Sequence, residues 1–228
     1  MSDIYNIFLG HFQCRPHNRL PLHTFFYLFL SFFFSTSIHP QNITHIDKDI
    51  TISHIDNILD ACNLTKSSND AISYSDLVIN ENRYTVFPSL EPIHFPDGKI
   101  NWNVSLETAE NTYHLYLHSL MTVNYLCSAF EATNNSTYLT QALDIFYQWV
   151  QYSDADKKSY FYGDRNLNYY TWYSHSASYR TLSTIYLYIL ANKLNMIDDS
   201  HRDVFFNTLN NHGIYLSNPD NYLQFNHG

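Results

Sequence analysis

Glycine is scarce in this sequence, with only five among 228 residues. Tight hairpin turns and close approaches of the backbone to a nucleotide depend on glycine, because it adopts positive φ without strain. An all-β sandwich or a dinucleotide-binding fold is therefore disfavoured. Hydrophobic residues make up 45% of the chain, enough for a sizeable core, which argues against wholesale disorder.

Basic residues are also few. The 12 Lys and Arg are outnumbered by 21 Asp and Glu, which gives a formal net charge of −9, and no basic cluster occurs. Binding to nucleic acid is disfavoured for this reason. A polyanionic substrate remains open, because a cleft can be locally basic on an acidic protein and the 13 His residues supply titratable positive charge.

Cysteine is limited to Cys14, Cys62 and Cys127, without the spacing of metal ligands or of a CxxC pair. An odd number of scattered cysteines does not form a disulfide framework. Cys127 lies on an apolar helical stripe, which predicts an ordinary core residue.

One long apolar run stands near the N-terminus, from Thr24 to Ile38. It is short for a membrane span of about twenty residues. Arg15 and Arg19 precede it, and small residues around Ser35 follow, which is the order of a secretory signal peptide. We expect export to the periplasm or the exterior from residues 1–38; a membrane anchor and a buried helix are the alternatives.

Residues 39–99 predict an irregular entry segment with one short amphipathic helix around 52–62. Residues 66–70 (KSSND) predict a polar loop. The prolines at 88, 92 and 96 and the Asp97-Gly98 turn interrupt regular structure between 86 and 99.

From Ser105 onward the apolar residues recur with a helical period. One continuous helix is expected from a cap at Ser105 to about residue 133, and others at about 137–152, 174–194 and from Asp198 or Asp199 to 217. The inner positions of these helices are Tyr116, Leu120, Val123, Cys127 and Phe130, then Tyr138, Ala142, Ile145 and Trp149, then Leu182, Ile185 and Ile189, then Phe205, Leu209, His212 and Leu216. The pattern predicts an all-α fold of antiparallel helical hairpins.

Four stretches taken in order resemble the heparinase II/III and alginate lyase group of polysaccharide lyases. They are Ile100–Asn103, Thr112–Trp149, Trp172–Arg180, and Asn211–Leu216 with the terminal Asn-His-Gly at 226–228. The resemblance covers about residues 85–228. It departs from the family at Ser174, where Asp usually precedes the His, and this puts a carboxylate partner for His175 in doubt.

The resemblance implies that residues 100–228 form an incomplete α/α toroid, which a β-sandwich domain follows in complete enzymes. It implies β-elimination on a uronic-acid polysaccharide of the alginate or heparan type, without a cofactor. Related lyases also use a Tyr and further His and Arg residues from beyond the corresponding point, so we expect the chain to be inactive by itself.

Asn226 and His227 are the catalytic candidates that the resemblance implies. An elimination removes the C5 proton beside a carboxylate, whose negative charge must be neutralised by hydrogen-bond donors. The amide of Asn226 donates without carrying charge, and His227 suits either the base or a second donor. The alternative is a plain helix end capped by glycine.

Trp172, His175, Arg180 and Tyr222 are the candidates for substrate binding. Trp172 could stack on a sugar ring or pack in the core, and His175 could line the cleft or have a structural role. Arg180 could bind a substrate carboxylate in a bidentate manner, or brace neighbouring helices through buried hydrogen bonds. His114 and His118 have the i, i+4 spacing of metal ligands but lack an evident third ligand, so no metal is expected.

Two other classes of function stay open at this point. An α/α-toroid glycoside hydrolase would need two carboxylates across a cleft; Glu107, Glu110 and Asp164 are available, although capping accounts for the first two. A non-catalytic carbohydrate-binding or remnant module is the other alternative.

Overall fold

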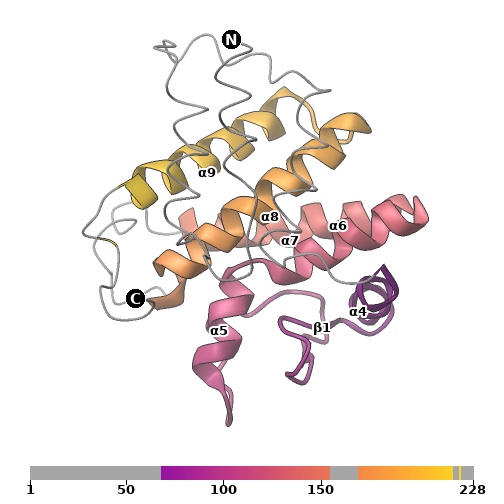
Figure 1. The fold of residues 1–228 in the computed structure, drawn as a ribbon, viewed down its shortest axis with the longest axis vertical. Helices are drawn as coiled ribbons and strands as arrows, with labels where there is room; N and C mark the ends of the chain where they lie inside the picture. The colour runs from indigo at the N-terminus through magenta and orange to yellow at the C-terminus, as the bar shows by residue number, and fades with distance from the viewer. Residues whose placement is uncertain (1–67, 155–168, 218–220, 222–228) are drawn as a thin grey trace, which may run out of the picture. The chain divides into compact units, whose positions relative to one another are not determined.

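The computed structural model describes residues 68–154, 169–217 and 221, and these residues form a helical domain with one small hairpin (Figure 1). The elements are α4 (Ser68–Glu81), β1 (Arg83–Tyr84), β2 (Ile93–His94), α5 (Glu110–His118), α6 (Met121–Thr133), α7 (Ser136–Asp154), the 3-10 helix η2 (Tyr169–Trp172), α8 (Ser174–Lys193) and α9 (Asp199–Ser217). The expected all-α class, an α/α toroid of helical hairpins, is confirmed.

Helices α6 and α7 form the hairpin that the sequence predicts. Asn134 adopts the left-handed conformation (φ 57°) that ends α6. The side chain of Asn135 then accepts a hydrogen bond from the main-chain N–H of Thr137, which is the contact of an N-cap residue. Two asparagines thus reverse the chain, and the inner positions of α7, which are Tyr138, Ala142, Ile145 and Trp149, are all buried.

The continuous helix predicted from Ser105 to residue 133 is wrong. Helix α5 begins only at Glu110 and ends at His118, and α6 begins at Met121. Leu120 separates them with a left-handed backbone (φ 56°), which an amino acid with a Cβ rarely adopts. At the start of α5 the side chain of Glu110, and not that of Ser105, makes the hydrogen bond. Its Oε1 accepts from the main-chain N–H of Leu106.

Helix α8 is the central helix of the described residues, because it contacts α5, α6, α7, η2 and α9 (Figure 1). Its bounds agree with the prediction, but the predicted inner line is only partly right, since Ile185 and Ile189 are half-buried. Most of its fully buried positions are small or polar, namely Ser176, Ala177, Arg180, Ser183, Thr184 and Ala191, and Leu187 adds a large apolar side chain. Small side chains let α8 approach several neighbours at once.

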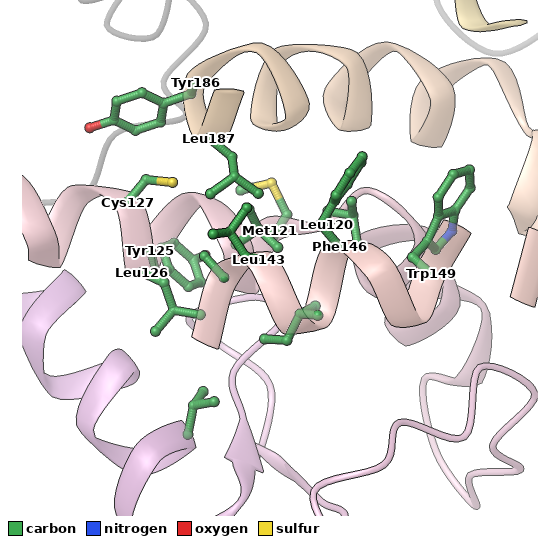
Figure 2. Packing of buried hydrophobic residues seen from close by; sticks show 14 of the residues in the cluster. Leu120, Met121, Tyr125, Leu126, Cys127, Leu143, Phe146, Trp149, Tyr186 and Leu187 are labelled. Carbon is green, nitrogen blue, oxygen red and sulfur yellow. The ribbon is translucent and has the colours of Figure 1, made fainter. Parts of the chain in front are cut away.

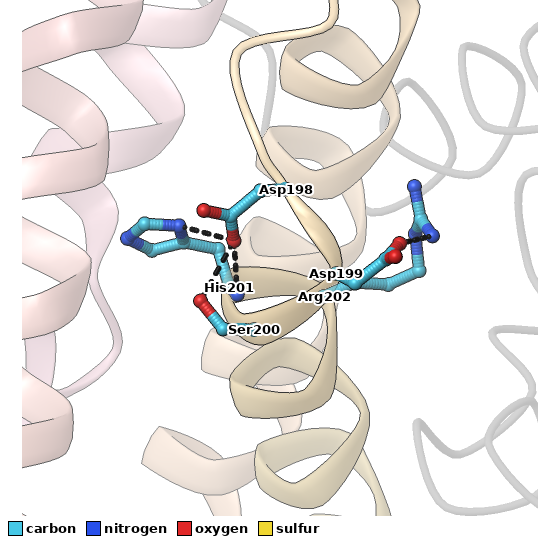
Figure 3. A network of polar contacts seen from close by, with 5 residues as sticks. All are labelled: Asp198, Asp199, Ser200, His201 and Arg202. Carbon is cyan, nitrogen blue, oxygen red and sulfur yellow. Dashed lines mark hydrogen bonds and ion pairs between the residues drawn. The ribbon is translucent and has the colours of Figure 1, made fainter.

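Helix α9 begins at an acidic N-cap, as predicted (Figure 3). The Oδ1 of Asp198 accepts from the main-chain N–H of His201 at 2.9 Å, and also from the Ser200 hydroxyl and the His201 ring. These donors lower the pKa of Asp198 to about 2. Arg202 forms an ion pair with Asp199 on the same turn.

Helix α4 corrects the prediction of a polar loop at 66–70, because the helix already begins at Ser68. It packs on α6 and leads into the hairpin, in which Arg83 pairs with His94 and Tyr84 with Ile93. The segment before residue 100 therefore contributes a helix to the core. The helix predicted at 52–62 and the apolar run at 24–38 lie outside the described residues.

The core lies between α8, α6, α7 and α4 (Figure 2). Phe146 and Leu187 are fully buried within it, and each such side chain contributes about 1.5–3 kcal/mol by leaving water. Cys127 is fully buried and free, as expected, and burial raises the pKa of its thiol well above the usual range. Among the described helices none is long and apolar enough to span a membrane.

Candidate functional site

The candidate site is centred on Arg180, which α8 places next to the 3-10 helix η2. Trp172 ends η2, and α8 begins two residues later, at Ser174. The Cζ atom of Arg180 lies 5.5 Å from the centre of the Trp172 ring. Of the predicted site residues, these two are therefore brought together by the fold.

Arg180 has no exposed surface, and each of its nitrogens has a protein acceptor. Nε donates to Nε2 of His212 at 2.8 Å, and one terminal nitrogen donates to the carbonyl of Thr171 at 2.8 Å. The other terminal nitrogen donates to the carbonyl of His118. The guanidinium thus joins α5, η2 and α9 to α8, which is the bracing arrangement weighed in the sequence analysis.

The charge of Arg180 is compensated by dipoles and rings. Among the described residues no carboxylate forms an ion pair with it, since those ion pairs all lie at the surface. Its Cζ lies 4.0 Å from the centre of the Trp149 ring, a cation–π distance. Burial lowers the pKa of Arg180 well below the usual range. The carbonyls and the indole faces replace a counterion here.

A polar stripe on α8 binds carbonyls at the end of α5 and in the break before α6. The Ser176 hydroxyl donates to the carbonyl of Leu115, Arg180 to that of His118, and the Ser183 hydroxyl lies 3.5 Å from that of Ser119. The last carbonyls of a helix lack intrahelical partners and carry partial negative charge. The stripe therefore stabilises the end of α5 from a neighbouring helix.

Two fully buried histidines lie on either side of Arg180. Nε2 of His212 accepts from Arg180, so this imidazole is neutral with its proton on Nδ1, on the side of the Thr208 carbonyl. Nε2 of His118 lies 3.1 Å from the carbonyl of Trp102, to which it donates. Burial first, and then the charge of Arg180, lower the pKa of both imidazoles well below 6.5.

His114 extends this group along α5, one helical turn before His118. The two rings are nearly parallel, with centroids 6.1 Å apart. Burial lowers the pKa of His114 as well. In the described part of the chain no group of three His, Cys, Asp or Glu side chains is placed to hold a metal ion.

An aromatic group surrounds the start of α8. The Tyr169 ring contacts those of Tyr170 and Tyr173, at centroid distances of 5.2 and 5.5 Å. The ring of His175, a predicted site residue, is half-buried and lies 5.3 Å from the Tyr173 ring. His175 therefore belongs to this aromatic group rather than to the Arg180 centre.

Trp172 connects the site to the end of the chain. Its ring packs against Trp149, His212 and Tyr215, the packing role that the sequence analysis gave as an alternative to stacking on a sugar. The Tyr215 hydroxyl donates to the Trp172 carbonyl, and the Asn221 amide donates to the Tyr215 carbonyl at 2.8 Å. The predicted residues Tyr222, Asn226 and His227 follow directly but lie outside the described residues.

The partners that hold Arg180 could not be recognised from the sequence. Trp149 and His212 were expected only as inner positions of their helices, and the carbonyls of His118 and Thr171 leave no signal in a sequence. Tyr169 was missed because nothing in its sequence context distinguishes an exposed tyrosine from a buried one.

Comparison with known protein families identifies the class of domain. The family model described as Heparinase II/III N-terminus matches residues 42–227. The match covers most of the 228 residues, and the chain therefore belongs to the family of heparinase II/III N-terminal domains. It begins well ahead of residue 85, so α4 and the hairpin are part of the family domain. Comparisons with curated proteins and with solved structures gave no match.

Proposed function

We propose that this protein takes part in the β-elimination of a uronic-acid polysaccharide, with Asn226 and His227 in the reacting site. The observation that carries the proposal is the family match, which extends through residue 227 and so includes the Asn-His pair. Heparinases are lyases of uronic-acid polysaccharides, and the family name thereby indicates the class of reaction.

The fold gives the Asn-His pair a defined starting point. Asn221 is bonded to Tyr215, which is bonded to Trp172. Asn226 lies five positions after Asn221 in the sequence, and an extended chain of that length spans at most about 17 Å. The proposal therefore puts the pair within that reach of Asn221.

The chemistry assigns a role to each member of the pair. A base removes the C5 proton, the C4–O bond to the next sugar breaks, and a C4=C5 double bond forms while the leaving oxygen takes up a proton. No water is consumed. Asn226 donates to the substrate carboxylate and neutralises its charge, and His227 acts as the base or as a second donor.

Arg180 has a bracing role in the proposed site and does not contact the substrate. Arg180 is fully buried and bonded to protein acceptors, so it fixes η2 and α9 rather than offering a free fork to a carboxylate. These bonds position α9 and the 3-10 helix η2, which ends at Trp172. His175 and Tyr222 remain the proposed contacts to substrate, whereas the ring of Trp172 packs against Trp149, His212 and Tyr215.

The product separates this proposal from hydrolysis. The full gene product is incubated with alginate, heparan sulfate and other uronans, and the products are analysed by ultraviolet absorbance and mass spectrometry. Elimination gives an unsaturated, ultraviolet-absorbing uronate of unchanged total mass. Products whose total mass exceeds that of the substrate by one water for each bond cleaved, without that absorbance, would show a hydrolase and contradict the proposal.

A further inference from the structure

We propose that Tyr169, supported by Tyr170 and Tyr173, is a stacking subsite for one sugar ring of the polysaccharide. This inference rests on the proposed function, since it assigns a substrate contact to the same site. Tyr169 is absent from the substrate-binding candidates of the sequence.

The exposure of Tyr169 is the first observation. Its side chain is 63% exposed, the largest exposed fraction among the large hydrophobic residues of the described chain, ahead of Ile214 and Leu194. A single exposed apolar residue is ordinary by itself. What distinguishes Tyr169 is that its two neighbours are aromatic and fix its ring.

The second observation is the geometry of the three rings. Tyr169 meets Tyr170 edge to face, with an interplanar angle of 81°. Tyr170 meets Tyr173 in the same way, at 5.5 Å and 76°. Arg180 also holds the backbone of this turn through the carbonyl of Thr171. An exposed ring that is already fixed loses little conformational entropy on binding, which favours affinity.

The chemistry of this surface suits a sugar of an acidic polysaccharide. A tyrosine offers an apolar face to the C–H groups of a sugar ring and a hydroxyl to its oxygens. Burial first, and then the neighbouring tyrosines, raise the pKa of Tyr169 and Tyr170. Their hydroxyls therefore stay protonated and uncharged when they meet a polyanion.

The subsite belongs to the turn at Trp172, to which α9 is bonded. Tyr169 is three residues before Trp172, whose carbonyl accepts from Tyr215. The occupant that fits both features is a polysaccharide chain, with one sugar on Tyr169 and another at the reacting site.

Calorimetric titration tests the subsite directly. Size-defined oligosaccharides of alginate and of heparan sulfate are titrated into the full gene product carrying Tyr169→Ala, Tyr169→Phe or no substitution. Leu194→Ala serves as the matched control, because it removes another exposed side chain, 41% exposed, at the opposite end of α8. Circular dichroism checks that each variant is folded.

We expect Tyr169→Ala to weaken binding roughly threefold to tenfold, the range typical of one aromatic contact. Tyr169→Phe should retain most of the affinity, and Leu194→Ala all of it. Equal affinity of Tyr169→Ala and the unsubstituted protein would overturn the subsite, as would no binding of any oligosaccharide or an equal loss in Leu194→Ala.

The elimination assay keeps the two proposals distinguishable. Tyr169-dependent binding without an unsaturated product would contradict the proposed function and leave the subsite standing. Elimination with the same KM in Tyr169→Ala and in the unsubstituted protein would contradict the subsite and leave the proposed function standing.

Discussion

Nε of Arg180 lies 2.8 Å from Nε2 of His212, and both side chains are fully buried. The bond joins α8 to α9 across 32 residues of sequence. Burying a charge without a counterion costs free energy unless its hydrogen bonds are complete. Arg180 meets that condition through His212, two carbonyls and the face of Trp149, so the stability of the domain depends on it.

Arg180→Ala should destabilise the domain by about 3–5 kcal/mol, because it leaves three buried acceptors without donors and a cavity beside Trp149. Arg180→Lys should also be destabilising, since a single ammonium cannot reach three separated acceptors. Urea denaturation measures both. Arg202→Ala is the control, because Arg202 pairs with Asp199 at the surface, and we expect a change within about 0.5 kcal/mol. A similar loss in both alanine variants would contradict the central role of Arg180.

The stability of the domain should fall as the pH drops below about 6.5, the ordinary pKa of histidine. The pKa of His118 and of His212 is lowered well below that value in the folded protein. Between the two values the unfolded chain binds protons that the folded protein does not, so acid favours unfolding. Each histidine lowers the free energy of unfolding by up to about 1.4 kcal/mol for each pH unit. This loss continues as the pH falls, until the pKa of the histidine in the folded protein is reached.

Chemical denaturation at a series of pH values measures this slope. The double variant His118→Gln/His212→Gln should show a shallower slope than the unsubstituted protein between pH about 6.5 and about 5. His94→Gln, which replaces an exposed histidine of the hairpin, controls for the loss of an imidazole. An unchanged slope in the double variant would show that these two histidines are not the source.

Ala109→Gly should stabilise the protein. Ala109 precedes α5 with a left-handed backbone (φ 51°, ψ 25°), and its side chain is exposed. Glycine at this position relieves a strain of about 1–2 kcal/mol in the folded protein. It also raises the conformational entropy of the unfolded chain, which offsets part of the effect and leaves a net stabilisation of about 0.5–1 kcal/mol. Thermal unfolding measures the gain. Ala132→Gly, at an exposed position inside α6, should instead lose about 1 kcal/mol. If both variants lose stability, the strain at Ala109 is refuted.

Much of the fold could be predicted, because three long helices carry regular apolar patterns and recognisable ends. The asparagines before α7 and Asp198 before α9 are capping residues that the sequence displays openly. The family resemblance extended this to the toroid class. The spacing of apolar residues along the chain predicts that a helix forms and which of its faces is buried.

The break at Leu120 and the start of α4 could not be predicted for the same physical reason. Leu120 lies on an apolar stripe that continues through the break, and the left-handed turn is stabilised by donors from α8 instead of by a local glycine. The polar start of α4, Ser68–Asp70, has the composition of a loop, although Asp70 is favourable in a first helical turn. Tertiary contacts determine both the helix break at Leu120 and the first residue of α4.

The role of Arg180 could not be predicted from the sequence. Its motif indicates importance, but a substrate-binding arginine and a bracing arginine have the same local sequence. The difference depends on His212 and on the carbonyls of His118 and Thr171, which the fold brings together from distant positions.

The proposal that Asn226 and His227 carry the elimination has one most direct test. Asn226→Ala and His227→Ala are made in the full gene product, and the rate of unsaturated uronate formation is measured on the uronan that the unsubstituted protein cleaves. Asn226→Ala should lower kcat by a factor of about 100 to 1000, as the loss of one donor to a developing charge does elsewhere. The helical content seen by circular dichroism should stay the same. Full activity in Asn226→Ala would remove this residue from the reaction and contradict the account.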